Sequence, residues 1–154
     1  MMKTKLLLIG LMIVGVGFTS CKKDKTEAVE EIGYGTSFGM CVGYCLNEVT
    51  IINSGKITLT KRANGINPST KTCIKTIDES EVSTLKDLVN TNEFAKLPEV
   101  IGCPDCADGG AECISLRVEG KVKKVTFEHG KAPNELKELV QRLKGIKESF
   151  EGCN

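Results

Sequence analysis

The chain has 154 residues, and its 21 basic side chains almost balance its 20 acidic ones. This near-neutrality argues against nucleic-acid binding, which needs a basic face. There is no Trp and only 5% of the residues are aromatic, which weakens the case for stacking on carbohydrate. The length suits one compact domain.

Residues 1–20 have the form of a secretion signal. Lys3 and Lys5 precede an apolar run at 6–18, and the small residues Thr19 and Ser20 follow it. As a helix, this run would span roughly 20 Å, against about 30 Å for the hydrocarbon core of a bilayer. We therefore predict a removed signal peptide rather than a transmembrane anchor.

The residues before Cys21 resemble a lipobox, the site where signal peptidase II cuts before a diacylated cysteine. Phe18 stands where Leu is usual, and ordinary cleavage near Ser20 is the alternative. Lipidation at Cys21 (palmitate and related acyl chains) would make membrane attachment effectively permanent. Lys22 follows the cysteine, and by resemblance to lipoprotein sorting this favours the outer membrane. We predict a signal peptide at 1–20, a lipidated flexible tether at 21–33 and a single domain at 34–154.

The first half of the domain reads as three strands and a helix. Residues 46–53 and 56–62 are β-branched or alternating, and a turn at Asn53-Ser54-Gly55 joins them into a hairpin. Residues 71–77 are predicted to form a third strand. Asp78 and Glu81 have the spacing of a capping box, and apolar residues follow at helical spacing until about residue 90.

The second half reads as a hairpin and a helix. Residues 112–118 and 121–127 flank the Glu119-Gly120 turn, and Pro133 suits a first helical position before an apolar stripe over 136–150. The predicted order is βββαββα. It indicates an α+β fold with an antiparallel sheet of about five strands and two helices on one face.

Seven cysteines remain once Cys21 carries lipid, and an oxidising compartment favours their pairing. Because seven is odd, at most three disulfides form and one thiol is left. The pairing is open: the two cysteine-rich loops either close on themselves or are joined to each other. The candidates are Cys41, Cys45, Cys73, Cys103, Cys106, Cys113 and Cys153.

Other chemistries compete for the two loops. The C-x3-C and C-x2-C spacings could supply four thiolates to zinc, although oxidation competes with metal binding outside the cytoplasm. Cys103 and Cys106 could form a redox dithiol, but they lead into a strand rather than a helix N-terminus, and acidic residues nearby oppose thiolate formation. Asp105, Asp108 and Glu112 are weak calcium candidates without the usual ligand spacing. We expect no metal and no cofactor.

The two loops also carry a resemblance. The F-G-x-C-x-G-x-C pattern at 38–45, the G-C-P-D-C-A-D-G-G-A-E stretch at 102–112 and the closing hairpin and helix resemble a family of small bacterial lipoproteins that contain a domain of unknown function. The likeness spans about residues 34–150. It implies an envelope-anchored α+β domain and brings no catalytic residues. Cys73, Cys113 and Cys153 are extras on this pattern.

Nothing in the sequence assembles a catalytic set. His129 is the only histidine, and no nucleophile motif accompanies it. We therefore expect no enzyme, but a disulfide-stabilised binding or interaction domain anchored to the outer membrane, with a possible envelope protein partner and no nucleic acid. The alternatives are a thiol-redox or metal-binding protein that uses Cys103 and Cys106, and a periplasmic hydrolase inhibitor.

Overall fold

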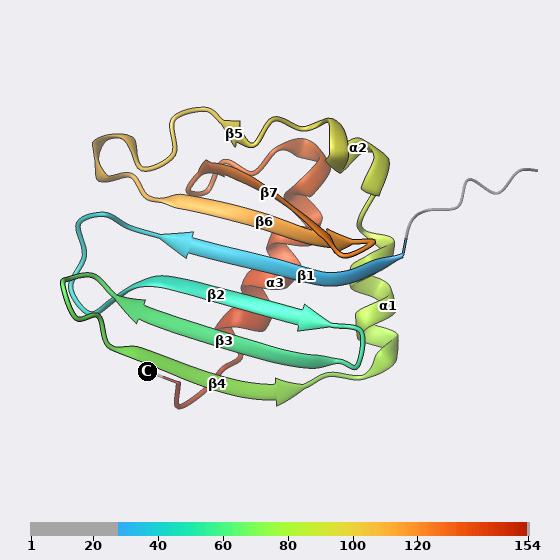
Figure 1. Ribbon diagram of the computed structural model, residues 1–154, viewed down its shortest axis with the longest axis horizontal. Helices are drawn as coiled ribbons and strands as arrows, with labels where there is room; N and C mark the ends of the chain where they lie inside the picture. Colours follow the sequence, from blue (N-terminus) through green and yellow to red (C-terminus); the bar gives the residue numbers. More distant parts are fainter. Residues whose placement is uncertain (1–27, 154) are drawn as a thin grey trace, which may run out of the picture.

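The computed structural model describes residues 28–153 as an α+β fold built on one mixed sheet of seven strands (Figure 1). The signal peptide, Cys21 and most of the predicted tether lie outside the described residues. The strands are β1 (Val29–Ser37), β2 (Tyr44–Ile52), β3 (Lys56–Ala63), β4 (Thr70–Thr76), β5 (Val100–Ile101), β6 (Ala111–Val118) and β7 (Lys121–Glu128). The helices are α1 (Glu79–Asp87), α2 (Thr91–Lys96) and α3 (Lys137–Glu148).

The strand order in the sheet is β4-β3-β2-β1-β6-β7-β5. All neighbours are antiparallel except β5 and β7, which run parallel. β1 lies at the centre, where it joins the β2–β3–β4 meander to the β6–β7 hairpin. The pairing of β1 with β6 therefore connects segments that are far apart in the sequence.

One face of the sheet carries the hydrophobic core. Because strand side chains alternate between faces, Ile32 and Tyr34 of β1 point to the same face as Ile114 and Leu116 of β6, and all four are buried. Apolar residues of all three α-helices join them in one cluster, and α3 crosses this face behind the sheet in Figure 1. No helix among residues 28–153 is long and apolar enough to cross a bilayer.

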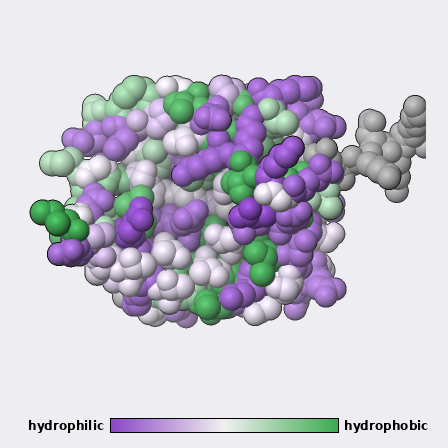
Figure 2. All heavy atoms as spheres, viewed as in Figure 1, coloured by the Kyte–Doolittle hydropathy of each residue, from purple (hydrophilic) through white to green (hydrophobic). Residues whose placement is uncertain are grey.

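No helix of residues 28–153 covers the opposite face. Figure 2 looks onto this face, and its centre is pale and recessed between more hydrophilic side chains. The residues here are the alternate ones of each strand, among them Gly35, Glu48, Thr60, Cys113 and Thr126, which form one row across β2, β3, β1, β6 and β7. We call this surface the open face.

The boundary predicted between tether and domain was wrong. β1 begins at Val29, so residues 29–33 belong to the central strand rather than to a tether. The cause lies in the alternation itself: the core-facing Ile32, Tyr34 and Thr36 are interleaved with Gly33 and Gly35. Glycine in a strand has no side chain to pack and weakens the strand pattern, so the segment looks like a loop.

The predicted five strands and two helices describe the fold only in part. The three strands and the hairpin that were predicted appear within two residues of their expected bounds. The sequence did not reveal β1, the two-residue β5 or the short helix α2. Asp78 is the N-cap of α1, but its side chain makes no capping hydrogen bond, so the capping box does not form. After Pro133, a 3₁₀ turn (Asn134–Leu136) precedes α3.

Candidate functional site

A cavity of about 230 Å³ lies on the open face, over the central strand β1. It is open to solvent on one side, and strands from both halves of the sheet contribute to its walls. The lining residues are Gly35, Thr36, Ser37, Leu46, Asn47, Glu48, Thr60, Arg62, Thr70, Ala111, Glu112, Cys113, Lys124 and Thr126. Six of the seven strands contribute at least one of these residues, and β5 contributes none.

Glycine forms the floor of this cavity. A Cβ on Gly35 would lie 2.7 Å from Sγ of Cys113, and a Cβ on Gly33 would overlap Oγ of Ser115. The side chains of Cys113 and Ser115 therefore lean across β1 into the space that a larger residue at either position would occupy. Of the two glycines that concealed β1 in the sequence, Gly35 lines the cavity floor, where its lack of a side chain makes room for the Cys113 thiol.

Cys113 is the one cysteine of residues 28–153 that forms no disulfide. Its thiol is half-buried at the cavity floor. Burial raises the pKa of this thiol, and the Lys124 ammonium, through its charge and a hydrogen bond, opposes the rise without cancelling it. At neutral pH Cys113 is therefore a neutral thiol and a poor nucleophile.

We predict that native Cys113 reacts slowly with iodoacetamide at pH 8. Because its pKa is raised, less thiolate is present than in the unfolded chain. Alkylation should therefore be severalfold slower in native protein than in urea, and the alkylation rate should increase at higher pH values than it does in the unfolded chain. Lys124→Gln removes the group that lowers the pKa and should slow the reaction further. A native rate equal to the unfolded rate would contradict this account. Mass spectrometry of the alkylated peptide measures both rates.

Charged side chains of both signs surround the cavity. Arg62 on β3 and Lys124 on β7 are exposed cations, and Glu48 on β2 is an exposed anion. Within residues 28–153, none of the three belongs to an ion pair. Their charges are therefore available to a ligand.

The other six cysteines of residues 28–153 form three disulfides. Cys41–Cys45 and Cys103–Cys106 close the two predicted loops on themselves, with Cα–Cα distances of 5.7 Å and 5.5 Å. Cys73–Cys153 joins the edge strand β4 to the C-terminal segment, with a Cα–Cα distance of 6.3 Å. The two loops are not bridged to each other, and their four sulfur atoms do not meet as a zinc site.

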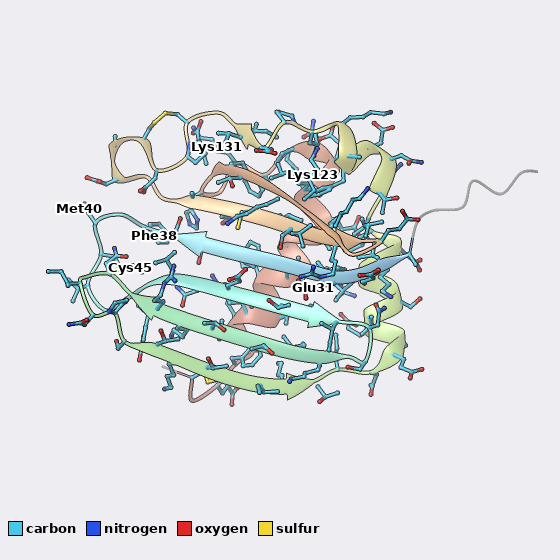
Figure 3. All side chains as sticks on the ribbon, viewed as in Figure 1. Glu31, Phe38, Met40, Cys45, Lys123 and Lys131 are labelled. Atoms are coloured by element: carbon cyan, nitrogen blue, oxygen red, sulfur yellow. A yellow bond between two sulfur atoms is a disulfide. The ribbon has the colours of Figure 1, made fainter. Side chains whose placement is uncertain are left out.

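Both cysteine loops lie at the same end of the sheet (Figure 3). The Gly39 amide donates a hydrogen bond of 3.3 Å to Oδ1 of Asp105, which joins the loops. The same carboxylate oxygen accepts a hydrogen bond from the Gly110 amide at 3.2 Å. The Asp105 carboxylate thus holds the backbone of both loops in place.

The three calcium candidates are not brought together as a site. Asp105 is engaged by backbone amides, and Asp108 is exposed in the loop. The buried Glu112 lies 3.0 Å from Nδ1 of His129. Among residues 28–153, no three His, Cys, Asp or Glu side chains lie close enough to hold a metal ion.

On the core side of the sheet, behind the cavity, the second neighbour of Glu112 is Tyr34. Tyr34 is 1% exposed, and its hydroxyl has no hydrogen-bond partner within the described chain. Burial, together with the charge of Glu112, raises the pKa of Tyr34. The Phe38 ring packs edge-on against His129, with 4.9 Å between ring centroids. The loop that follows β1 therefore packs against the residue that follows β7, and this residue also contacts the start of β6 through Glu112.

Sequence reasoning named only Cys113 and Glu112 among the cavity residues. Lys124 follows Lys123 in the sequence, but the two side chains lie on opposite faces of the sheet. Lys123 donates to the Leu97 carbonyl at 2.6 Å on the core side, whereas Lys124 reaches the cavity. The alternation of β2 could have shown that Glu48 faces away from Val49. The pairing of β1 with β6 joins segments far apart in the sequence, so no local sequence pattern indicates it.

Comparison with models of known protein families gives no match, and comparison with curated proteins gives no significant match. The resemblance to small lipoproteins through the two cysteine loops therefore stays a prediction. The geometry of the cavity is the remaining basis for a function.

Proposed function

We propose that this protein is a non-catalytic binding protein of the cell envelope, anchored by lipid on Cys21, that holds a small polar ligand in the cavity of the open face. The observation that carries this proposal is the cavity itself. It lies on a sheet face that no helix of the described residues covers, has Gly35 at its floor, and presents hydroxyl groups beside charged groups of both signs. Concave sites with a few convergent polar groups are where small ligands usually bind.

The chemistry of the lining supports binding rather than catalysis. Among the described residues, Cys113 is the only thiol at the cavity, and its raised pKa leaves it protonated at neutral pH. Glu112, the buried carboxylate of the lining, is engaged by His129. The cavity thus offers fixed charges and hydrogen-bond partners, but no activated nucleophile beside a base.

The lipid anchor rests on the signal and the cysteine at residue 21, outside the described residues. Because Lys22 follows this cysteine, as in lipoproteins sorted to the outer membrane, we propose that the protein is attached there. The intact mass of protein extracted from membranes tests the anchor: a mass that starts at residue 21 and includes acyl chains supports it. An unmodified Cys21 would show that the chain is secreted without lipid.

A disulfide-stabilised scaffold suits this role. No disulfide-bonded cysteine lines the cavity, so ligand binding needs no change in the redox state of the three bridges. The observation that supports the alternative thiol-redox function is that Cys103 and Cys106 are exposed. It predicts rapid exchange of that bridge with a mild reductant, whereas the binding function predicts full binding with all three bridges intact.

Thermal unfolding of the mature lipoprotein in detergent tests the binding function. We expect at least one member of a panel of free amino acids, short peptides, carboxylic acids and sugars to raise Tm, because a ligand that binds only the folded state stabilises it. Thr60→Trp, which fills the cavity from β3, should abolish that rise. Thr58→Trp, two residues away on the same face but outside the lining, should leave it intact. A rise that survives Thr60→Trp, or no rise with any member, would contradict the proposal.

A further inference from the structure

The charges at the cavity define its ligand more narrowly, if the proposed binding function holds. Two cations, Arg62 and Lys124, stand beside one free anion, Glu48. The other acidic residue of the lining, Glu112, is 3% exposed and lies 3.0 Å from Nδ1 of His129, so its carboxylate is buried and already has a polar partner. The side chains available to a ligand therefore carry two positive charges and one negative charge.

The strand register separates these charges across the cavity floor. Glu48 is paired with Gly35, and Gly35 is paired with Cys113, so the carboxylate and the thiol flank the floor on opposite sides. Lys124 reaches Cys113 from the β7 side. Arg62 stands beyond Glu48 on β3, one row closer to the loops. A ligand lying over Gly35 would meet a cation at each end and the carboxylate along its length.

The uncharged lining adds hydrogen bonds and one apolar wall. Ser37, Thr60 and Thr126 offer hydroxyl groups, and Leu46 and Ala111 offer methyl groups at the loop end. The cavity volume of about 230 Å³ is below the roughly 300–1,000 Å³ of sites for drug-sized ligands. Its occupant is therefore small.

We propose that the cavity binds a small amino-dicarboxylate, that is, an acidic amino acid or a short peptide carrying one. Its two carboxylates pair with Arg62 and Lys124, and its ammonium pairs with Glu48. The guanidinium of Arg62 suits bidentate pairing with a carboxylate. A ligand of this class carries the inverse of the three free charges of the cavity, and its methylene groups pack on Leu46 and Ala111.

Cys113 provides a reporter for this test, because it is the one free thiol of the described chain and lies at the cavity floor. With the mature lipoprotein in detergent, we expect L-glutamate or D-glutamate to slow iodoacetamide alkylation of Cys113 at least fivefold at saturation. Glutarate lacks the ammonium and glutamine lacks one carboxylate, so both should need at least tenfold higher concentrations. Equal protection by glutarate would overturn the role of Glu48.

Variants examine each charge separately, with binding measured by calorimetry because Lys124 also affects the reactivity of the thiol. Arg62→Gln and Lys124→Gln should each raise Kd for glutamate about tenfold, as expected for the loss of a charge-assisted hydrogen bond. Glu48→Gln should remove the preference for glutamate over glutarate. Lys56→Gln, at the far end of β3 on the same face, should change nothing. An unchanged Kd in both cation variants would overturn the assignment.

The same assay separates this inference from the proposed function. If neither glutamate nor an acidic dipeptide protects Cys113, while another member of the panel does so in the wild type but not in Thr60→Trp, the ligand class is wrong and the binding function stands. If no member of the panel protects Cys113, both are wrong.

Discussion

Removing the Cys73–Cys153 disulfide as Cys73→Ala/Cys153→Ala is expected to lower the free energy of unfolding by about 4 kcal/mol. The bridge joins residues separated by 80 positions, and in the chain-entropy model a long closed loop constrains the unfolded state strongly. It also ties the C-terminal segment to β4, the edge strand of the sheet. Cys153 is 2% exposed and belongs to the core, so the substitution also removes buried contacts.

The Cys41–Cys45 bridge provides the matched control. It spans only four positions, so Cys41→Ala/Cys45→Ala should cost about 2 kcal/mol by the same relation. Cys45 is 1% exposed, so each of the two double variants removes one buried cysteine. Urea unfolding under non-reducing conditions measures both values. Equal losses for the two variants would show that Cys73–Cys153 does not stabilise the fold by closing the long loop.

Gly110→Ala is expected to destabilise the protein by about 2 kcal/mol or more. Gly110 has a φ of +79°, a conformation that costs an L-residue about 1–2 kcal/mol. An added Cβ would also overlap the ring of Phe38, which packs against Gly110. The Gly110 carbonyl accepts hydrogen bonds from the amides of Asp105 and His129 at 3.0 Å and 3.2 Å, so a shift here disturbs both.

The neighbouring Gly109 is the control for this substitution. Its φ of −71° is ordinary for any residue, and its nearest neighbour, the Cys106 carbonyl oxygen, is 3.1 Å from the added Cβ. Gly109→Ala should therefore change the unfolding free energy by no more than about 0.5 kcal/mol. Displacement of Phe38 should also expose its amide, which donates to the Cys45 carbonyl at 3.1 Å, to faster hydrogen exchange in Gly110→Ala alone. Similar effects of the two substitutions would contradict the role assigned to Gly110.

The parts of the fold with strong local patterns could be predicted from the sequence. The β2–β3 and β6–β7 hairpins combine alternating residues with turn sequences, and both glycines of these turns, Gly55 and Gly120, have positive φ. The apolar stripe of α3 places Leu139 and Leu143 in the core as expected. In each case neighbouring residues decide the structure.

The central strand and the cavity could not be predicted in this way. Gly33 and Gly35 conceal β1 because they lack the side chains that mark a strand, and Gly35 is also part of the cavity floor. The register that sets Gly35 beside Cys113 depends on a pairing between distant segments. The odd number of cysteines predicted one unpaired thiol, but only the fold shows that it is Cys113 and that it lies in the cavity.

The binding role of the open face is tested most directly by amide NMR spectra of the protein, recorded while glutamate, or the panel member that raises Tm most, is added. The account predicts shifts concentrated on Gly35, Glu48, Cys113 and Thr126, which share one row of the sheet under the cavity. Shifts confined to the exposed loop residues Met40, Val42 and Ile66, with the central row unchanged, would contradict it.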